Sequence, residues 1–146
     1  MNIQLNTSNI NWDRVVEILS EVSMATYAPE IHQAAFEKSE VVVFVFEGDI
    51  LVGFGRAISD GTYQAAVYDV AVWPSFQGKG VGTLILDTLV EHCQHCNITL
   101  YASPGKEGFY EKHAFRKMKT GMALFRDAEK MKAKGFTEEA VQKSVS

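Results

Sequence analysis

Three glycines at alternate positions, Gly78, Gly80 and Gly82, form the stretch whose residue types point most directly to chemistry. An apolar run that stops at Pro74 precedes them, and apolar residues at helical spacing follow from Leu84. The order is therefore strand, glycine loop and helix start. The first turn of a helix has unpaired N–H donors and the positive end of the helix dipole, so this junction can hold an anion such as a phosphate. A Cβ at these glycines could block a phosphate or forbid the turn.

Two familiar phosphate-binding loops fit this stretch poorly. A P-loop needs two glycines separated by four residues and then Lys and Ser or Thr, a pattern that the sequence lacks. A dinucleotide-binding loop has a wider second gap between its glycines and lies near the start of a βαβ unit. Here both gaps are one residue long, and antiparallel strands are expected before the loop. The loop therefore calls for a third type of phosphate site.

The two cysteines, Cys93 and Cys96, raise the alternatives of a redox pair and half of a metal site. They fall at the predicted end of a helix, whereas a reactive thiolate is favoured at the N-terminal end. A zinc site also needs further ligands, and only His92 and His95 are nearby in sequence. We therefore expect two ordinary reduced thiols and no metal.

The composition narrows the class of protein. The chain has 146 residues, 47% hydrophobic and 22% charged, which is typical of one soluble domain. A formal net charge of -4 gives no sign of the basic face that nucleic-acid binding usually needs. No apolar run reaches 18 residues, so neither a spanning helix nor a membrane partner is expected. The N-terminus lacks the segments of a signal peptide, which leads us to expect a cytoplasmic location.

The first third of the chain predicts one strand and two helices. Residues 2–6 favour a short strand, and Asn11 is a suitable cap for a helix that begins at Trp12. Pro29 interrupts this helix and can open a second one. Residues 24–36 are therefore expected to form a bent helical region with aromatic side chains at the bend. Tyr27 there is open to two interpretations, core packing and the wall of a substrate pocket.

Strands are predicted over residues 41–46, 50–58 and 63–72 because β-branched and aromatic residues are frequent and turn residues separate them. The short links require an antiparallel meander. A helix from about Gly80 to Cys96 and a strand over 97–102 then form a parallel crossover. The fold class is thus α/β, or α+β, with a mixed and mostly antiparallel sheet.

The C-terminal part predicts a short helix over 106–113 and a final hairpin from strands at 115–119 and 121–126. Beyond Arg126 the sequence indicates one or two weakly amphipathic helices split at Gly135, or a partly mobile tail. We therefore expect one domain over 1–126, with 127–146 as its helical C-terminal extension.

The glycine loop resembles that of the GNAT superfamily of N-acetyltransferases. Gln77–Gly82 matches the family pattern Gln/Arg-x-x-Gly-x-Gly/Ala. Asp69–Val72 with Pro74 resembles the strand that enters this loop, and Gly108–Phe115 resembles the later Phe/Leu-Tyr-Glu-Lys-x-Gly-Phe segment. The order of elements also agrees, so the resemblance covers most of the chain.

A closer resemblance is to plant plastid serotonin N-acetyltransferases and their bacterial relatives. It rests on four segments, Gly53–Ala57, Ser59–Asp60, Asp69–Val70 and Asn97–Leu100.

The family implies acetyl-coenzyme A as co-substrate and a sheet that splays at a central strand, between strands 63–72 and 98–102, commonly at a bulge. The pyrophosphate would sit on backbone N–H groups from Gln77 to Gly82, and pantetheine would lie along the strand that holds Val70–Val72. Lys79 would add charge or remain a solvated surface lysine. The coenzyme contacts implied in this way are Val70, Ala71, Val72, Gln77, Gly78, Lys79, Gly80, Val81, Gly82, Thr83, Ser103, Phe109 and Tyr110.

The resemblance also implies the residues that act on the reacting atoms. Tyr110 aligns with the family tyrosine that protonates or hydrogen-bonds the departing sulfur, and its alternative is packing against the sheet. Asp69 is the candidate base or amine anchor, on the opposite strand face from Val70. Its alternative is a structural ion pair with Arg56, and solvent could then take the proton.

Two positions depart from the family pattern. Ser103 stands where the family often has an asparagine that contacts the coenzyme, so its shorter side chain puts that contact in doubt. Ala114 replaces the usual glycine before Phe115, and a left-handed backbone there would cost on the order of 1 kcal/mol. His32 and His113 are expected to be surface or local packing residues.

The resemblance therefore predicts an acetyltransferase that moves acetyl from acetyl-coenzyme A directly to a primary amine of a small molecule. The substrate residues expected are Tyr27, Arg56 and Asp69, and the aromatics would suit an arylalkylamine. The alternative is a non-catalytic acyl-coenzyme A sensor or binding module. For the C-terminal tail, a homodimer contact and a helix packed on its own domain are both open.

Overall fold

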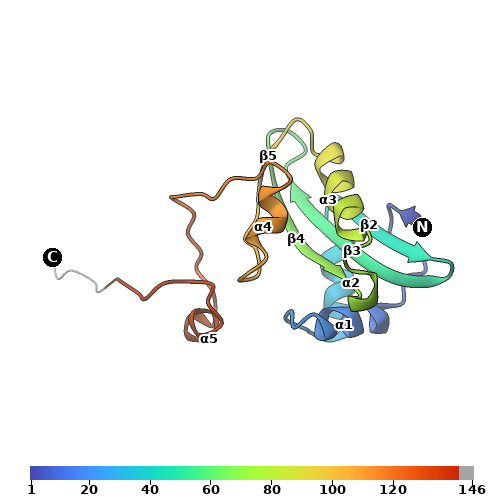
Figure 1. Ribbon diagram of the computed structural model, residues 1–146, viewed down its shortest axis with the longest axis horizontal. Coiled ribbons are helices and arrows are strands. Elements are labelled where there is room, and N and C mark those ends of the chain that lie inside the picture. Colours follow the sequence, from blue (N-terminus) through green and yellow to red (C-terminus); the bar gives the residue numbers. More distant parts are fainter. Residues whose placement is uncertain (142–146) are drawn as a thin grey trace. The chain divides into compact units, whose positions relative to one another are not determined.

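The computed structural model describes residues 1–141 of the chain. They form two compact units that divide after Leu100. The expected division at Arg126 stays a prediction. The first unit holds a five-stranded sheet in the order β1-β2-β3-β4-β5, and Figure 1 labels its elements.

Helix α1, Trp12–Glu21, begins as its sequence predicts, because the Asn11 side chain accepts the Arg14 N–H. It ends at a left-handed residue, Ser23, with φ of 62°. Pro29 then opens helix α2, Pro29–Glu37. The expected bent helical region over 24–36 is wrong in its first part, since residues 24–28 are not helical. The reason is local, because Ala28 before the proline is held extended at ψ 146°.

The sheet confirms the predicted meander. Strand β1, Asn2–Gln4, pairs with β2, Val41–Glu47, and β2 pairs with β3, Ile50–Ser59, both antiparallel. Strand β4, Gln64–Val72, continues the antiparallel order, and β5, Asn97–Thr99, joins it in parallel. The strand expected over 97–102 is therefore shorter than predicted.

Helix α3, Val81–His92, links β4 and β5 after the short 3₁₀ helix η1, Pro74–Phe76. It is shorter than the predicted helix to Cys96. Its last turn tightens when the Cys93 N–H bonds to Val90 O, three residues back, and Cys93 leaves the helical region. Cys93 and Cys96 are both free, as expected.

Two layers of apolar side chains cover the faces of the sheet. On one face, Val81, Ile85 and Leu89 of α3 pack with buried valines of β2 and β3. On the other, Phe36 of α2 packs with Phe44 and Phe54, all fully buried, together with Ile18 and Leu19 of α1. Each face buries several large side chains at roughly 1.5–3 kcal/mol each, so the sheet is a rigid frame.

The second unit contains α4, Glu107–Glu111, and α5, Ala128–Ala133. An aromatic cluster of Tyr101, Phe125 and Phe136 joins its beginning to its end, with ring centroids 5.5 Å apart for Tyr101–Phe125 and 5.9 Å for Tyr101–Phe136. The alternative of a tail packed on its own domain therefore has support through Phe136. Residues 142–146 of the predicted extension lie outside the described part.

The predicted final hairpin is wrong for this structure, because no residue between 115 and 126 forms a strand. The chain does bend at the expected place, since a Cβ at Gly121 would lie 3.5 Å from Met118 Cβ. The side chains of Met118, Met122 and Leu124 are exposed, at 61, 97 and 87%. Two strands need a third partner or a packed face to be stable, and neither is provided here.

Candidate functional site

A β-bulge interrupts β4 at Asp69 and Val70. Phe54 of β3 pairs with Ala71, and Arg56 pairs with Tyr68, so Gly55 alone faces the two bulged residues. Asp69 has a left-handed backbone, with φ of 56°, which is uncommon for a residue other than glycine. Backbone strain of this kind clusters at functional sites, so the bulge in β4 is a candidate position for the functional site.

The bulge changes which side chains of β4 face α3. Before it, Ala65 and Val67 pack on the α3 side, and after it Val70 and Val72 do, so the alternation shifts by one residue. Ala71 packs on the opposite face. The Asp69 side chain thus lies on the opposite face of β4 from Val70, as predicted. The extra residue of the bulge turns it away from α3.

Gly55 allows helix α3 to approach the bulge. A Cβ at this position would lie 2.8 Å from Ile85 Cγ2 and 3.2 Å from both Leu89 Cδ1 and Val70 Cγ2. These atoms belong to packed side chains, so any larger residue would push α3 or the bulge away. The sequence signal for this feature is a glycine inside a strand.

The edge of β4 that faces β5 has no strand partner after Ala66, so it is unpaired at the bulge and beyond it. The register of the pair runs from Gln64–Asn97 to Ala66–Thr99, and in residues 1–100 no strand pairs with β4 past Ala66 on that side. The Trp73 N–H donates to Val52 O in β3 at 2.8 Å, so by alternation the backbone groups of Val72 face the unpaired edge. The pairing ends where β5 ends, at Thr99, and the splay that the family resemblance implies between residues 63–72 and 98–102 stays a prediction.

The glycine loop follows directly after this edge. Gly78 and Gly80 have φ of 76° and 87°, and a Cβ at either would meet nothing within 4 Å. The glycines are therefore required by the turn and not by crowding. Gln77–Gly80 is exposed, and the first hydrogen bond of α3 among the described ones runs from Leu84 N–H to Gly80 O at 3.0 Å. The preceding amides of Val81 and Gly82 therefore stand at the positive end of α3.

Three side chains and amides of the loop have partners of their own. Gln77 Nε2 donates to Val72 O at 3.0 Å, and the Gln77 N–H donates to Pro74 O at 3.2 Å. Lys79 Nζ lies 5.2 Å from the centre of the Phe76 ring. These contacts tie the loop to the end of β4. Val81 is buried, Gly82 half-buried and Thr83 exposed.

Arg56 and Asp69 form an ion pair on the face of α1 and α2. Arg56 Nε donates to Asp69 Oδ2 at 2.8 Å, with the side chains 15% and 25% exposed. Arg56 Nη1 also donates to Ser39 Oγ at 3.2 Å, and the guanidinium lies 5.3 Å from the Tyr68 ring centre. The ion pair predicted as an alternative for Asp69 is therefore present, and it fixes the carboxylate at the bulge.

Tyr27 lies on the segment between α1 and α2, and its side chain is 60% exposed. It is therefore not a core residue. Its ring centre lies 5.5 Å from that of His32, and its backbone N–H donates to His32 Nε2 at 2.9 Å. His32 is buried, as its local packing role predicts, and burial lowers the pKa of its imidazole. The hydrogen bond itself has no signal in the sequence.

The predicted residues of the second unit gather around α4. Tyr110 is half-buried, its ring centre is 5.1 Å from that of Phe109 and 5.9 Å from that of Phe115, and burial raises the pKa of its phenol. Tyr110 is therefore protonated throughout the neutral range. Ser103 is also half-buried, and its carbonyl accepts the Lys106 N–H.

The turns that follow helix α4 end at Ala114, whose φ is 70°. The Phe115 N–H donates to Tyr110 O at 3.1 Å, a bond that closes the helix end around a left-handed residue. The predicted cost of alanine at this position therefore applies.

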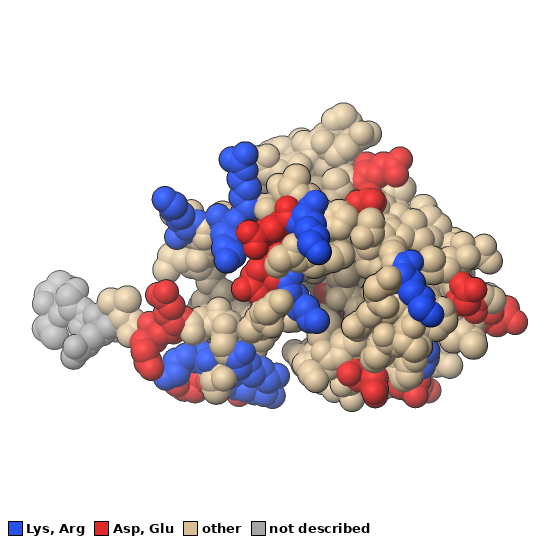
Figure 2. Space-filling view, in the orientation of Figure 1, with Lys and Arg blue, Asp and Glu red and all other residues tan. Residues whose placement is uncertain are grey.

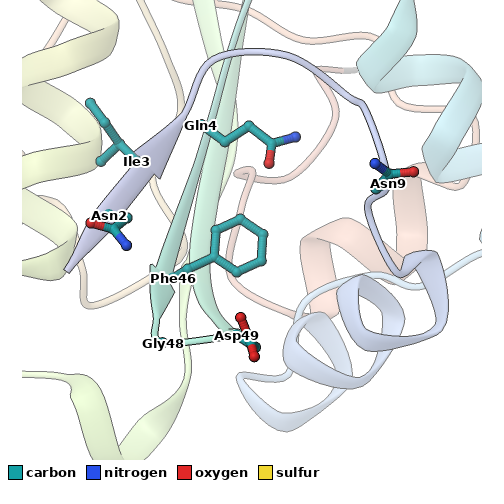
Figure 3. A pocket seen from close by; sticks show the side chains of 7 residues that line it. All are labelled: Asn2, Ile3, Gln4, Asn9, Phe46, Gly48 and Asp49. Carbon is teal, nitrogen blue, oxygen red and sulfur yellow. The ribbon is translucent and has the colours of Figure 1, made fainter.

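Other features of the described residues lie outside this group. A polar hollow beside β1 is lined by Asn2, Gln4, Asn9, Phe46 and Asp49 among others, none of them a predicted site residue (Figure 3). In residues 1–141 no cluster of three His, Cys, Asp or Glu side chains is arranged to hold a metal ion. No helix in this range has the length and apolarity to cross a membrane.

Comparisons with known proteins agree with this arrangement. The family profile described as "Acetyltransferase (GNAT) domain" matches residues 15–125. The uncharacterized N-acetyltransferase ycf52 of Porphyra purpurea is 30% identical over 124 residues, which cover 80% of this chain and 71% of that protein. Serotonin N-acetyltransferase 2, chloroplastic, of Oryza sativa subsp. japonica is 30% identical over 139 residues, 88% of this chain and 70% of that protein.

Among solved structures, a GNAT family acetyltransferase from Streptococcus pneumoniae superposes with a TM-score of 0.72 at 23% identity. The match covers 86% of this chain and 98% of that one, and it shows a shared fold. With the family profile matched over most of the chain, the bulged β4 and the glycine loop have a family context: this chain belongs to the GNAT acetyltransferases.

Proposed function

We propose that this acetyltransferase moves an acetyl group from acetyl-coenzyme A to a primary amine of a small molecule by direct transfer. The observation that carries the proposal is the combination of an unpaired β4 edge after the Asp69 bulge with a glycine loop directly behind it. An unpaired strand edge offers backbone groups to the amides of pantetheine, in the way that a strand is added to a sheet.

The donor is supported by the loop geometry. Gly78 and Gly80 turn the backbone so that the amides before Leu84 stand at the start of α3, where a pyrophosphate finds both hydrogen-bond donors and a positive dipole. A dinucleotide would also satisfy these donors. The rings of a dinucleotide, however, lack amide groups that could hydrogen-bond along the edge of Val70–Val72, whereas the pantetheine arm of coenzyme A has such amides.

The reaction itself exchanges one bond for another. The amine nitrogen attacks the thioester carbonyl carbon, the C–N bond forms and the C–S bond breaks. The Val72 N–H, on the unpaired edge, is the donor proposed for the oxyanion. The amine gives up its proton to solvent.

Tyr110 is proposed to give its proton to the departing sulfur. This part of the proposal rests on the motif Gly108–Phe115 and on phenol chemistry. Burial raises the pKa of the phenol, so Tyr110 holds its proton at neutral pH and can give it to the thiolate as the C–S bond breaks; solvent then returns a proton to the phenolate.

The acceptor is proposed to lie on the opposite face of β4, near Asp69, Arg56 and Tyr27. Asp69 Oδ2 accepts from Arg56, and we assign its other oxygen to hold the incoming amine or its water. An exposed Tyr27 offers an aromatic surface. The rice relative is named for serotonin, so arylalkylamines are the first acceptors to test.

The charge distribution supports a cationic acceptor. Residues 1–100 carry twelve Asp or Glu against four Lys or Arg, whereas residues 101–146 carry six against ten. On the face shown in Figure 2, most blue side chains accordingly lie over α4 and α5 and the loops beside them. A negatively charged unit raises the local concentration of ammonium substrates.

The experiment combines coenzyme binding with an amine panel. Acetyl-coenzyme A binding is measured by calorimetry, and thiol release is followed with serotonin, tryptamine, spermidine and a lysine peptide. Release that is fastest with the arylalkylamines supports the proposal. Binding without turnover of any amine supports an acyl-coenzyme A sensor instead.

A further inference from the structure

The segment between α1 and α2 is held by a hydrogen bond that a buried histidine accepts. The Tyr27 backbone N–H donates to His32 Nε2 at 2.9 Å, and the two rings lie 5.5 Å apart. His32 is 4% exposed, whereas Tyr27 is 60% exposed. A side chain fixed in the core therefore positions a residue at the surface.

Local sequence explains why a histidine takes this role. The residue at the N-cap of α2 is Ala28, which has no side chain to accept a backbone N–H. His32 is the fourth residue of the helix, so its ring points back toward the N-terminus and reaches the amide two residues before Pro29. The bond ties the segment before α2 to the first turn of the helix.

The bond also sets the protonation state of the ring. Nε2 must be unprotonated to accept an N–H, so the neutral ring carries its proton on Nδ1. Protonation would turn Nε2 into a donor facing another donor, and the bond would be lost.

We propose that His32 is a positioning residue for the amine acceptor. The neutral imidazole fixes the Tyr27 segment at neutral pH, and its protonation in acid releases that segment. The inference rests on the proposed function in one respect, namely that Tyr27 borders the acceptor. The hydrogen bond and its pH dependence do not depend on that assignment.

The surroundings favour the neutral ring. Burial lowers the pKa of His32 most, Arg56 of β3 lowers it further, and Asp69 of β4 opposes them. The start of α2 adds a positive dipole that acts in the same direction as burial. The segment is therefore held at about pH 7.5 and is released only below the lowered pKa of His32, which itself lies below the ordinary histidine value near 6.5.

Two variants separate the hydrogen bond from packing. His32→Gln places an amide oxygen near the position of Nε2 and accepts the Tyr27 N–H at every pH. His32→Phe keeps a ring beside Tyr27 and removes the acceptor. His32→Gln shows which effects come from protonation of His32, and His32→Phe shows which effects come from loss of the hydrogen bond to Tyr27.

The first measurement is nuclear magnetic resonance and hydrogen exchange of the free protein, which needs no turnover. We expect the Nδ1–H tautomer at about pH 7.5 and a protection factor at the Tyr27 amide that falls at least about fivefold by pH 5, as expected for loss of about one hydrogen bond. His32→Gln should keep its protection. An Nε2–H tautomer, or protection that does not change with pH in the wild type, would overturn the inference.

The second measurement is steady-state kinetics with an accepted amine. We expect the amine KM of the wild type to rise about fivefold to tenfold between pH 7.5 and 5 relative to His32→Gln, with kcat changing alike in both. His32→Phe should show the raised KM at both pH values. If KM follows the same pH course in wild type and His32→Gln, the positioning role is wrong although acetyl transfer stands. If no amine is turned over, the proposed function fails. The hydrogen-exchange result still decides whether neutral His32 holds the Tyr27 segment.

Discussion

At the scale of single residues, the chemistry depends on two side chains with different kinds of support. Asp69 is held by a geometry that the structure shows, a left-handed backbone and a 2.8 Å ion pair with Arg56. Tyr110 is supported by its motif and by a phenol that burial keeps protonated. Each makes its own prediction.

Replacement of Tyr110 by Phe should lower kcat at least about tenfold, which corresponds to about 1.4 kcal/mol of barrier. In the proposed mechanism the phenol supplies a proton to the leaving sulfur, and phenylalanine keeps the ring contacts with Phe109 and Phe115. Steady-state thiol release measures the change, with the stability of both proteins compared by thermal unfolding. A variant with unchanged kcat would remove Tyr110 from the mechanism.

Replacement of Asp69 by Asn should raise the amine KM about tenfold, because the charge that holds the amine is lost. Asparagine tolerates the left-handed backbone, so the bulge remains. Arg56→Met is the matched control, since it also breaks the ion pair but keeps the carboxylate. Since we assign proton removal to solvent, the pH–rate profile of Asp69→Asn should keep the shape of the wild-type profile. A variant that loses the acidic limb of the profile, along which the rate rises as a carboxyl group deprotonates, would show that Asp69 is the base.

At the scale of elements, local rules in the sequence determined much of the fold. Asn11 caps α1, Pro29 opens α2, and the turns at 47–49 and 59–61 produce the meander, because each is decided by a few neighbouring residues. Gly78 and Gly80 likewise predicted the loop. Elements of this kind need no knowledge of distant parts of the chain.

Features that depend on distant pairing were not predictable. The hairpin expected over 115–126 has the right local pattern, but a hairpin needs further packing to persist. The place of the bulge follows from which residues of β3 face β4, and the His32–Tyr27 bond follows from a side chain that folds back over one turn. The turn of the glycine loop and the Arg56–Asp69 ion pair could therefore be predicted from the sequence, whereas the His32–Tyr27 bond could not, and the roles of the site residues stay predictions.

The glycine loop makes a prediction about coenzyme binding. Gly80→Ala should cost about 1 kcal/mol of stability because φ is 87°, and should also raise the KM for acetyl-coenzyme A by shifting the loop amides. Gly48→Ala is the matched control, since Gly48 also has a positive φ and open space around its Cβ site but lies in the β2–β3 turn. It should lose stability alone. Equal KM values in the two variants would contradict the pyrophosphate assignment.

The end of α4 makes a prediction about stability. Ala114→Gly should raise the free energy of unfolding by up to about 1 kcal/mol, because glycine adopts the left-handed backbone without strain. Ala133→Gly, at the last residue of α5, should lower it by up to about 1 kcal/mol, since glycine disfavours a helix. Denaturant unfolding measures both. A destabilised Ala114→Gly protein would show that the strain at this position is smaller than the entropy that glycine loses on folding.

At the scale of the whole molecule, the proposed site residues are distributed over two units whose net charges have opposite signs. The acidic unit of residues 1–100 contains the bulge, the glycine loop and the Arg56–Asp69 pair, and the basic unit of residues 101–146 contains Tyr110. Family membership makes the molecule an acetyltransferase, and the acceptor remains the part that is proposed. The central claim of the proposal is transfer of the acetyl group to an amine.

The most direct test is to supply acetyl-coenzyme A with a labelled acetyl group together with serotonin, and to measure free thiol and acetylated amine in the same sample. The account predicts that both appear in equal amounts, that neither appears above background without the amine, and that Tyr110→Phe slows them together. Bound acetyl-coenzyme A that yields no amine-dependent thiol with serotonin, tryptamine, spermidine or a lysine peptide would contradict it.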